Sequence, residues 1–214
     1  MRESLEKELK KLNQNLIRMA TMAEEAIKKA IKALEERDAV LAQNVILEDA
    51  EINALEKKIE AKTVKLIYRE QPVAMDLRSI LTALKMVTDI ERIGDHAADI
   101  SHLVLKIGDE GYSGIQNVHD MAYAAIRMVE YAVKSFANSD IELAKRVILM
   151  DDEVDKYFEK IKEDLVEKMR DVKIASKFAD WIANYLLIIK YIERIGDHAT
   201  NIAEWTIFNI TGSH

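Results

Sequence analysis

Two short acidic motifs are the part of this chain best suited to chemistry. The same seven residues, Glu-Arg-Ile-Gly-Asp-His-Ala, begin at Glu91 and again at Glu193. Residues four apart lie on one face of a helix, so Glu91 pairs with Asp95 and Glu193 pairs with Asp197. Two carboxylates at this spacing repel each other by about 0.2–0.5 kcal/mol, and an arginine or a bound cation relieves that repulsion. Each motif therefore predicts either a metal-binding face or an ion-paired face.

A second pair of polar residues with the same spacing precedes each motif. Asp49 and Asn53 form this pair in the first copy, and Asp151 and Asp155 form it in the second. Because neighbouring helices of a bundle run antiparallel, the two rows of each copy are expected to converge into one oxygen-rich site. Oxygen ligands suit Mg, Mn, Ca or Fe, and several carboxylates can share bridging metals. The alternative is that these residues are ordinary exposed positions on a helix.

A glycine lies inside each motif, although glycine in a helix interior costs about 1 kcal/mol relative to alanine. Gly94 and Gly196 serve either close helix packing or access of a ligand or metal to the flanking carboxylates. At about 100° per residue, the acidic row falls outside the apolar stripe that contains Ile90 and Ile93, which favours access. The rows continue with Asp99 and His102 in the first copy, and with Asn201 and Glu204 in the second.

The arginine and the histidine of each motif have lesser roles in this interpretation. Arg92 and Arg194 can each bridge to the aspartate three residues later, and for one copy alone a solvated ion-pair face would be the simpler explanation. Repetition of the whole motif favours a metal, with the arginines supporting the carboxylates. His96 and His198 point about 100° away from the centre of each acidic row and are expected to be partly exposed contact residues, not ligands.

The duplication extends far beyond the motif and defines two equivalent halves. The same offset of 102 positions aligns Asp38 with Asp140 and Ile100 with Ile202. A register kept without insertion predicts two structural repeats, residues 1–108 and 109–214, each large enough to bury a core. The glycines at 108, 111 and 114 mark the junction between them.

Helical periodicity and helix-breaking residues predict six long helices. In the first half they cover about 3–36, 39–69 and 72–106, with Asp38 as an N-cap and Pro72 in the first turn of the third. In the second half the breaks fall near 138–140 and 170–171, and the last helix ends near Thr211. The predicted fold is all-α, with two tandem homologous three-helix bundles arranged in series.

Composition excludes several classes of protein. Cysteine is absent, so there is neither a disulfide framework nor a thiolate site. A net charge of −7 argues against nucleic acid as the partner, and no apolar stretch approaches the length of a membrane span. A cytoplasmic protein is expected. No nucleotide-binding loop, nucleophile elbow or zinc-protease helix is present, so we predict no catalytic residues.

The duplicated motif, with Asp76-Leu77-Arg78 upstream and Asn201-Ile202-Ala203-Glu204 downstream, resembles the PhoU family of phosphate-uptake regulators over nearly the whole chain. The resemblance implies that acidic helix motifs bind a divalent or trivalent metal, as multinuclear iron or zinc clusters. Carried over by position, the ligands are Glu91, Asp95, Glu193, Asp197, Asp151, Asp155 and Asp49, with Asp99, Asn201 and Asn53 as additional candidates. Because Asn53 lacks a charge, the first cluster is expected to be smaller or weaker than the second.

The same resemblance implies a regulatory role, not an enzymatic one. It predicts a homodimer that damps high-affinity phosphate transport and the phosphate-starvation response. The expected partners are the ATPase subunit of the phosphate ABC transporter and a sensor histidine kinase, with peripheral membrane association through those partners. A metal-dependent phosphohydrolase and a purely structural helical adaptor are the alternatives.

Overall fold

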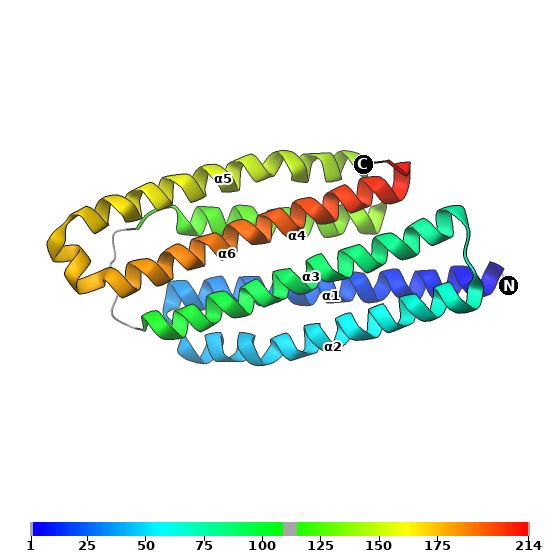
Figure 1. Ribbon diagram of the computed structural model, residues 1–214, viewed down its shortest axis with the longest axis horizontal. Helices are drawn as coiled ribbons and strands as arrows, with labels where there is room; N and C mark the ends of the chain where they lie inside the picture. The colour runs from blue at the N-terminus through cyan, green and yellow to red at the C-terminus, as the bar shows by residue number, and fades with distance from the viewer. Residues whose placement is uncertain (1, 109–114, 214) are drawn as a thin grey trace.

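The computed structural model describes residues 2–108 and 115–213, which form six helices and no strands. Three helices come from each half, in the same order and joined by short turns (Figure 1). Their bounds are α1 Arg2–Glu36, α2 Ala39–Glu70, α3 Ala74–Ile107, α4 Val118–Asn138, α5 Ile141–Arg170 and α6 Val172–Thr211. The predicted all-α fold is confirmed, and each predicted break lies within a few residues of an observed one.

The helix ends show how the sequence sets these bounds. Asp38 caps α2 by accepting a hydrogen bond from the Leu41 amide at 2.9 Å, and Asp140 caps α5 in the equivalent way. Gly108 ends α3 at a φ of 55°, a backbone conformation that glycine adopts without strain. The other two junction glycines, at 111 and 114, lie outside the described residues.

One predicted helix start is wrong. Pro72 does not lie in the first turn of α3, because Gln71 ends α2 in the left-handed region and Val73 is the extended N-cap residue of α3. Ala74, the first residue of α3, has a φ of 46°, so regular helical geometry begins only after it. Pro72 thus belongs to the turn between the two helices.

The two halves lie side by side and not end to end as two bundles in series. The most extensive contact between helices is that of α3 with α6, and α1 also contacts α4. Within the described residues α2 packs only on α1 and α3, and α5 packs only on α4 and α6, so these two helices form opposite edges of the molecule (Figure 1). A single core of buried residues, which includes Ile100 and Ile202, runs through both halves. Sequence periodicity could not reveal this arrangement, because it does not show which faces of two separate units meet.

Candidate functional site

The first acidic cluster is formed where α2 passes α3, by Asp49, Glu56, Glu91 and Asp95. Burial and the neighbouring carboxylate of Asp95 raise the pKa of Asp49 above its ordinary value. The same two causes raise the pKa of Glu91 to about 7, while Arg92 opposes the rise and Glu56 adds to it. Oδ1 of Asp49 lies 3.4 Å from the position of a β-carbon on Gly94, so this carboxylate of α2 faces the stretch of α3 between Glu91 and Asp95. The two rows of the first copy therefore lie side by side on neighbouring helices.

Buried oxygens in the first cluster lack hydrogen-bond partners. Oδ1 of Asp49, Oδ1 of Asn53 and Oε2 of Glu91 are all inaccessible and accept no hydrogen bond, although Nε of Arg92 lies 3.4 Å from Oε2 of Glu91. Asn53 uses its amide instead, donating to Oδ2 of Asp49 at 2.7 Å. Burying an unpaired polar atom costs about 1–3 kcal/mol, so these oxygens form an acceptor-rich pocket that a cation would satisfy.

The second acidic cluster lies at the equivalent place on α5 and α6, and consists of Asp151, Asp155, Glu193 and Asp197. The pKa of Asp151 is raised to about 6 by burial and then by the carboxylates of Asp155 and Asp197. Burial and Glu193 likewise raise the pKa of Asp197. Asp155 and Asp197 are exposed, whereas Asp151 and Glu193 are half-buried, so this cluster opens to solvent on one side.

Different cations neutralise the two clusters. Arg92 binds Asp95 at 2.9 Å, as its spacing predicts, and also lies 3.4 Å from Glu91. Among the described residues Arg194 forms no ion pair with Asp197, and its charge acts instead on Asp99 and His96. Lys190, which the motif does not include, donates to both oxygens of Glu193 at 2.6 and 2.5 Å.

Two of the additional candidate ligands lie away from the cluster centres. Asn201 does not face the second cluster, because its amide donates to Asp89 of α3 at 3.0 Å. Asp99 lies at the edge of the first cluster, where its charge still contributes to the raised pKa of Asp49. Its Oδ2 is 3.6 Å from Nδ1 of His96.

The motif histidines meet where α3 packs on α6. Their ring centroids are 5.5 Å apart, and His96 also stacks on Tyr191 at 5.3 Å. Nδ1 of His198 lies 2.9 Å from Oδ1 of Asp89, which stands 102 positions before Tyr191. The two histidines therefore face equivalent positions of the opposite half, one through a hydrogen bond and the other through ring stacking.

The expectation of a partly exposed histidine is wrong for His96. Its exposed fraction is 7 %, because α6 covers the face of α3 that carries it. Burial, together with the neighbouring His198, lowers the pKa of His96 to about 4, so the ring is neutral at neutral pH. His198 remains half-buried.

The two motif glycines have different surroundings. A β-carbon on Gly94 would lie 3.0 Å from Cδ1 of Ile52 and 3.4 Å from Oδ1 of Asp49, so close packing calls for glycine there. A β-carbon on Gly196 would make only ordinary contacts, the nearest at 3.5 Å with Oδ1 of Asp151. A methyl group on Gly196 would therefore fit, but it would cover Oδ1 of Asp151.

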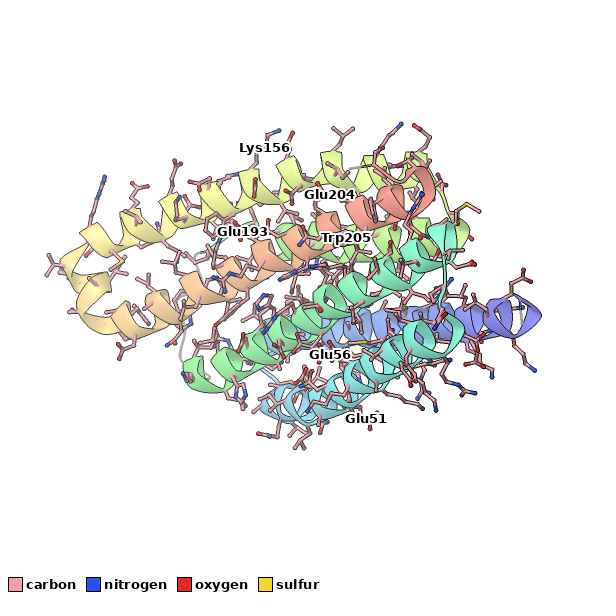
Figure 2. All side chains as sticks on the ribbon, turned by 45° about the vertical axis from the view of Figure 1, so that its right-hand side comes forward. Glu51, Glu56, Lys156, Glu193, Glu204 and Trp205 are labelled. Carbon is pink, nitrogen blue, oxygen red and sulfur yellow. The ribbon has the colours of Figure 1, made fainter. Side chains whose placement is uncertain are left out.

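The donor set of both clusters suits a hard cation, although the side chains are not gathered as ligands. Within residues 2–108 and 115–213, no three carboxylate or histidine side chains are already placed to hold a metal ion. Glu56 is carried by α2 and Glu193 by α6 (Figure 2). Side-chain rotation would be needed to bring such oxygens to a common centre.

Sequence reasoning missed three residues of these sites. Glu56 was overlooked although it lies seven positions after Asp49, on the same face of α2. Lys190 lies three positions before Glu193, which is a spacing for ion pairs, and Asp89 has no signal of its own. None of the three is repeated, since their equivalents in the other half are Phe158, Thr88 and Tyr191.

The fold and the paired acidic clusters define a class of all-helical proteins with two homologous three-helix units. The PhoU domain family matches residues 16–104 and again residues 118–206. The chain belongs to the PhoU family.

Relatives support this assignment along almost the whole chain. A Clostridium acetobutylicum protein described as a phosphate-specific transport system accessory protein PhoU homolog is 36% identical over 213 residues, 99% of this chain and 96% of that protein. A Pseudomonas aeruginosa homolog is 34% identical over 209 residues, 96% of this chain and 85% of its own.

Solved structures of relatives share the fold. The crystal structure of PhoU from Pseudomonas aeruginosa superimposes with a TM-score of 0.91 at 34% identity, covering 97% of this chain and 99% of that one. The phosphate transport system regulatory protein PhoU from Streptococcus pneumoniae gives a TM-score of 0.89 at 26% identity, covering 98% of both chains. No helix within the described residues is at once long and apolar enough to cross a membrane.

Proposed function

We propose that this protein is a non-enzymatic regulator of phosphate transport that works in the cytoplasm and carries metal on its two acidic clusters. The relatives named as phosphate transport accessory or regulatory proteins support the regulatory role. The observation that carries the metal proposal is the pairing of carboxylates from two helices in both halves, with pKa values raised to about 7 at Glu91 and about 6 at Asp151.

Each cluster has four carboxylates to offer a metal. In the first, Asp49, Glu56, Glu91 and Asp95 would hold it, with the Asn53 oxygen as a neutral ligand, so Glu56 offsets the charge that Asn53 lacks. In the second, Asp151, Asp155, Glu193 and Asp197 would hold it. A bound divalent or trivalent ion, including iron or zinc in multinuclear form, would reverse the local charge of each face.

This charge reversal connects the clusters to regulation. With no metal bound, both faces repel anionic ligands and acidic protein surfaces. When metal is bound, the same faces attract them, so metal occupancy would control docking of the ATPase subunit of the phosphate transporter or of a sensor histidine kinase. A homodimer would present these faces twice.

The decisive experiment measures metal content and partner binding together. Untagged protein is analysed for bound metal, and its binding to the purified ATPase subunit is measured with and without a chelator. The variant Glu193→Ala with Asp197→Ala should lose metal from the second cluster and weaken binding to the ATPase subunit. A matched control, Glu163→Ala with Glu167→Ala, removes two exposed carboxylates at the same spacing on α5 and should change neither.

Two outcomes would overturn the proposal. Unchanged metal content and unchanged partner binding in the Glu193→Ala, Asp197→Ala variant would indicate that the protein is a purely structural adaptor. Chelator-sensitive turnover of a phosphoester panel by the wild-type protein would indicate a metal-dependent hydrolase.

A further inference from the structure

A row of four basic residues lies along the last turns of α2. Its members are Lys58, Lys62, Lys65 and Arg69, which follow one another at steps of four, three and four residues. Such steps keep all four on one side of a helix. Lys58, Lys65 and Arg69 are exposed, while Lys62 is half-buried and lies 3.3 Å from Glu8 of α1. We call these four residues the basic row.

The basic row is a property of the first half alone. The equivalent positions are Lys160, Asp164 and Glu167 in α5, and Asp171 at its end. Three of the four charges are therefore reversed between two halves that otherwise keep the same fold. In a chain with a net charge of −7, this end of α2 is an exception that the fold does not require.

Large apolar side chains are exposed beside the basic row. Tyr68 is 84 % exposed and Val64, one turn earlier, is 62 % exposed. Val73 in the following turn and Met75 at the start of α3 are also exposed, at 73 % and 71 %. We call these four residues the apolar tip. Their equivalents in the second half are Val166, Arg170, Ala175 and Lys177, so the tip too lacks a full counterpart.

The turn that carries Val73 has an unusual backbone. Gln71 and Ala74 have φ values of 44° and 46°, a region that non-glycine residues seldom adopt, and Pro72 between them has a fixed φ. The turn lies at one end of the elongated molecule, beside the start of α1 (Figure 1). A broad surface can therefore approach it from outside the bundle.

We infer that this end of α2 docks directly onto an anionic lipid surface. Tyr68, Val73 and Met75 enter the headgroup region, and the basic row lies over the lipid phosphates. Exposed apolar side chains flanked by Lys and Arg are the chemistry of segments that bind in the plane of a membrane interface, and tyrosine is enriched at that depth.

The charges of the molecule also fit an oriented approach. Each Lys or Arg near an anionic leaflet strengthens binding about fivefold. Lys62 is paired with Glu8, so the charges that face the lipid are those of Lys58, Lys65 and Arg69, which outnumber the nearby Glu70 and Asp76. The acidic remainder of the protein is repelled by the same surface. The protein is therefore held by one end, with both acidic clusters left free. The inference does not depend on metal at those clusters.

Vesicle co-sedimentation of the full chain tests this inference. The protein, treated with a chelator so that metal cannot bridge carboxylates to lipid, is mixed with phosphatidylcholine vesicles with and without phosphatidylglycerol. Binding is expected only with phosphatidylglycerol and should weaken as salt is raised. Lys65→Glu with Arg69→Glu should weaken binding about 25-fold or more, and Tyr68→Ser with Met75→Ser about tenfold.

Matched controls use the second half, and all substitutions are at exposed positions. Lys156→Glu with Lys160→Glu, and Val166→Ser with Met169→Ser, should leave vesicle binding unchanged. Unchanged thermal melting establishes that the variants are folded. The inference fails if the wild-type protein binds vesicles equally well with and without phosphatidylglycerol. It also fails if the control variants lose as much binding as the α2 variants do.

Two further outcomes would point to another ligand and would also overturn the inference. Loss of binding in the charge variant alone, with no effect of Tyr68→Ser and Met75→Ser, would indicate an acidic polymer. Competition by inorganic phosphate beyond that of a salt of equal ionic strength would indicate a site for free phosphate.

Discussion

Lys190 donates hydrogen bonds from its Nζ to both carboxylate oxygens of Glu193, and so holds a positive charge inside the second acidic cluster. The equivalent residue of the first half is Thr88, and there the positive charge comes from Arg92, which binds Asp95. A metal would have to compete with an ammonium in one cluster and with a guanidinium in the other. The ammonium is the closer mimic of a metal ion because it is a compact point charge.

Removing the ammonium should strengthen metal binding at the second cluster. Lys190→Met keeps an apolar stem over the Phe158 ring, which the Lys190 Nζ approaches to 5.3 Å, and frees Glu193. Because the Lys190 side chain is 40 % exposed, the gain is modest, about threefold to tenfold in affinity. Metal titration of chelator-treated protein checks this. Lys145→Met, which breaks an exposed ion pair with Glu142, is the control, and an affinity unchanged in Lys190→Met would contradict the prediction.

Substitution of the two motif glycines by alanine should change the stability of the protein in opposite directions. Gly196→Ala is expected to stabilise the protein by about 0.5–1 kcal/mol through helix propensity, because its methyl makes only ordinary contacts. Gly94→Ala gains the same propensity but must displace Ile52, which is buried, so a net loss of up to about 2 kcal/mol is expected. Urea unfolding in the presence of a chelator measures both.

Gly196→Ala also separates stability from metal binding. Its methyl lies against Oδ1 of Asp151 and should weaken metal binding at the second cluster while the fold becomes more stable. Equal loss of stability in both alanine variants would show that the surroundings of the two glycines do not differ.

Neutralising Glu91 should stabilise the metal-free protein at high pH. Burial and the charge of Asp95 raise the pKa of Glu91 to about 7 from an ordinary 4.5, so the folded state disfavours the ionised form. The resulting loss in the free energy of unfolding is fully present above pH 7. It disappears as the pH falls through 7 toward 4.5, because over this range the folded state takes up the proton before the unfolded state does. Glu91→Gln should therefore raise the free energy of unfolding by roughly 1–3 kcal/mol at pH 8.

The pH dependence is the check on this third prediction. Urea unfolding with a chelator present should show the advantage of Glu91→Gln shrinking toward zero near pH 4.5. Glu163→Gln, at an exposed position of α5, should show no advantage at either pH. If the Glu91→Gln protein is less stable than the wild type at pH 8, the folded state stabilises the ionised carboxylate of Glu91, and the prediction is wrong.

Much of the fold was predictable because local signals set it. The cap at Asp38, the break near Asp140 and the junction that begins at Gly108 act within a few residues of the chain, and all three are seen. Pro72 was misplaced because the left-handed Gln71 before it shifted the start of α3. The side-by-side packing of the halves depends on distant faces and was not predictable from periodicity.

The candidate site was predictable only where the two halves agree. Repetition singled out the paired carboxylates, and the structure brings them together from two helices. Glu56 and Lys190 occur once each, so a search for repeated residues passes over them. The burial of His96 was missed for another reason, since a wheel of α3 alone does not show that α6 covers it.

Asp89 should be a main polar link between the halves. Its Oδ1 lies 2.9 Å from Nδ1 of His198 and accepts the amide of Asn201 at 3.0 Å, both from α6. The side chain is only 13 % exposed, so Asp89→Ala would leave the half-buried Nδ1 of His198 and amide of Asn201 without their shared partner. A loss of about 1–3 kcal/mol in the free energy of unfolding is expected.

The way in which the Asp89→Ala protein unfolds tests whether the halves form one cooperative unit. Because one core runs through both halves, urea unfolding should remain a single transition at a lower midpoint, with an unchanged slope. Asp89→Asn, which keeps an oxygen acceptor, should lose less, and Asp180→Ala, at an exposed position of α6, should lose little. Two separate transitions in Asp89→Ala would mean that the polar link, and not the shared core, makes the halves unfold together. An unchanged midpoint would mean that water replaces the carboxylate at no cost.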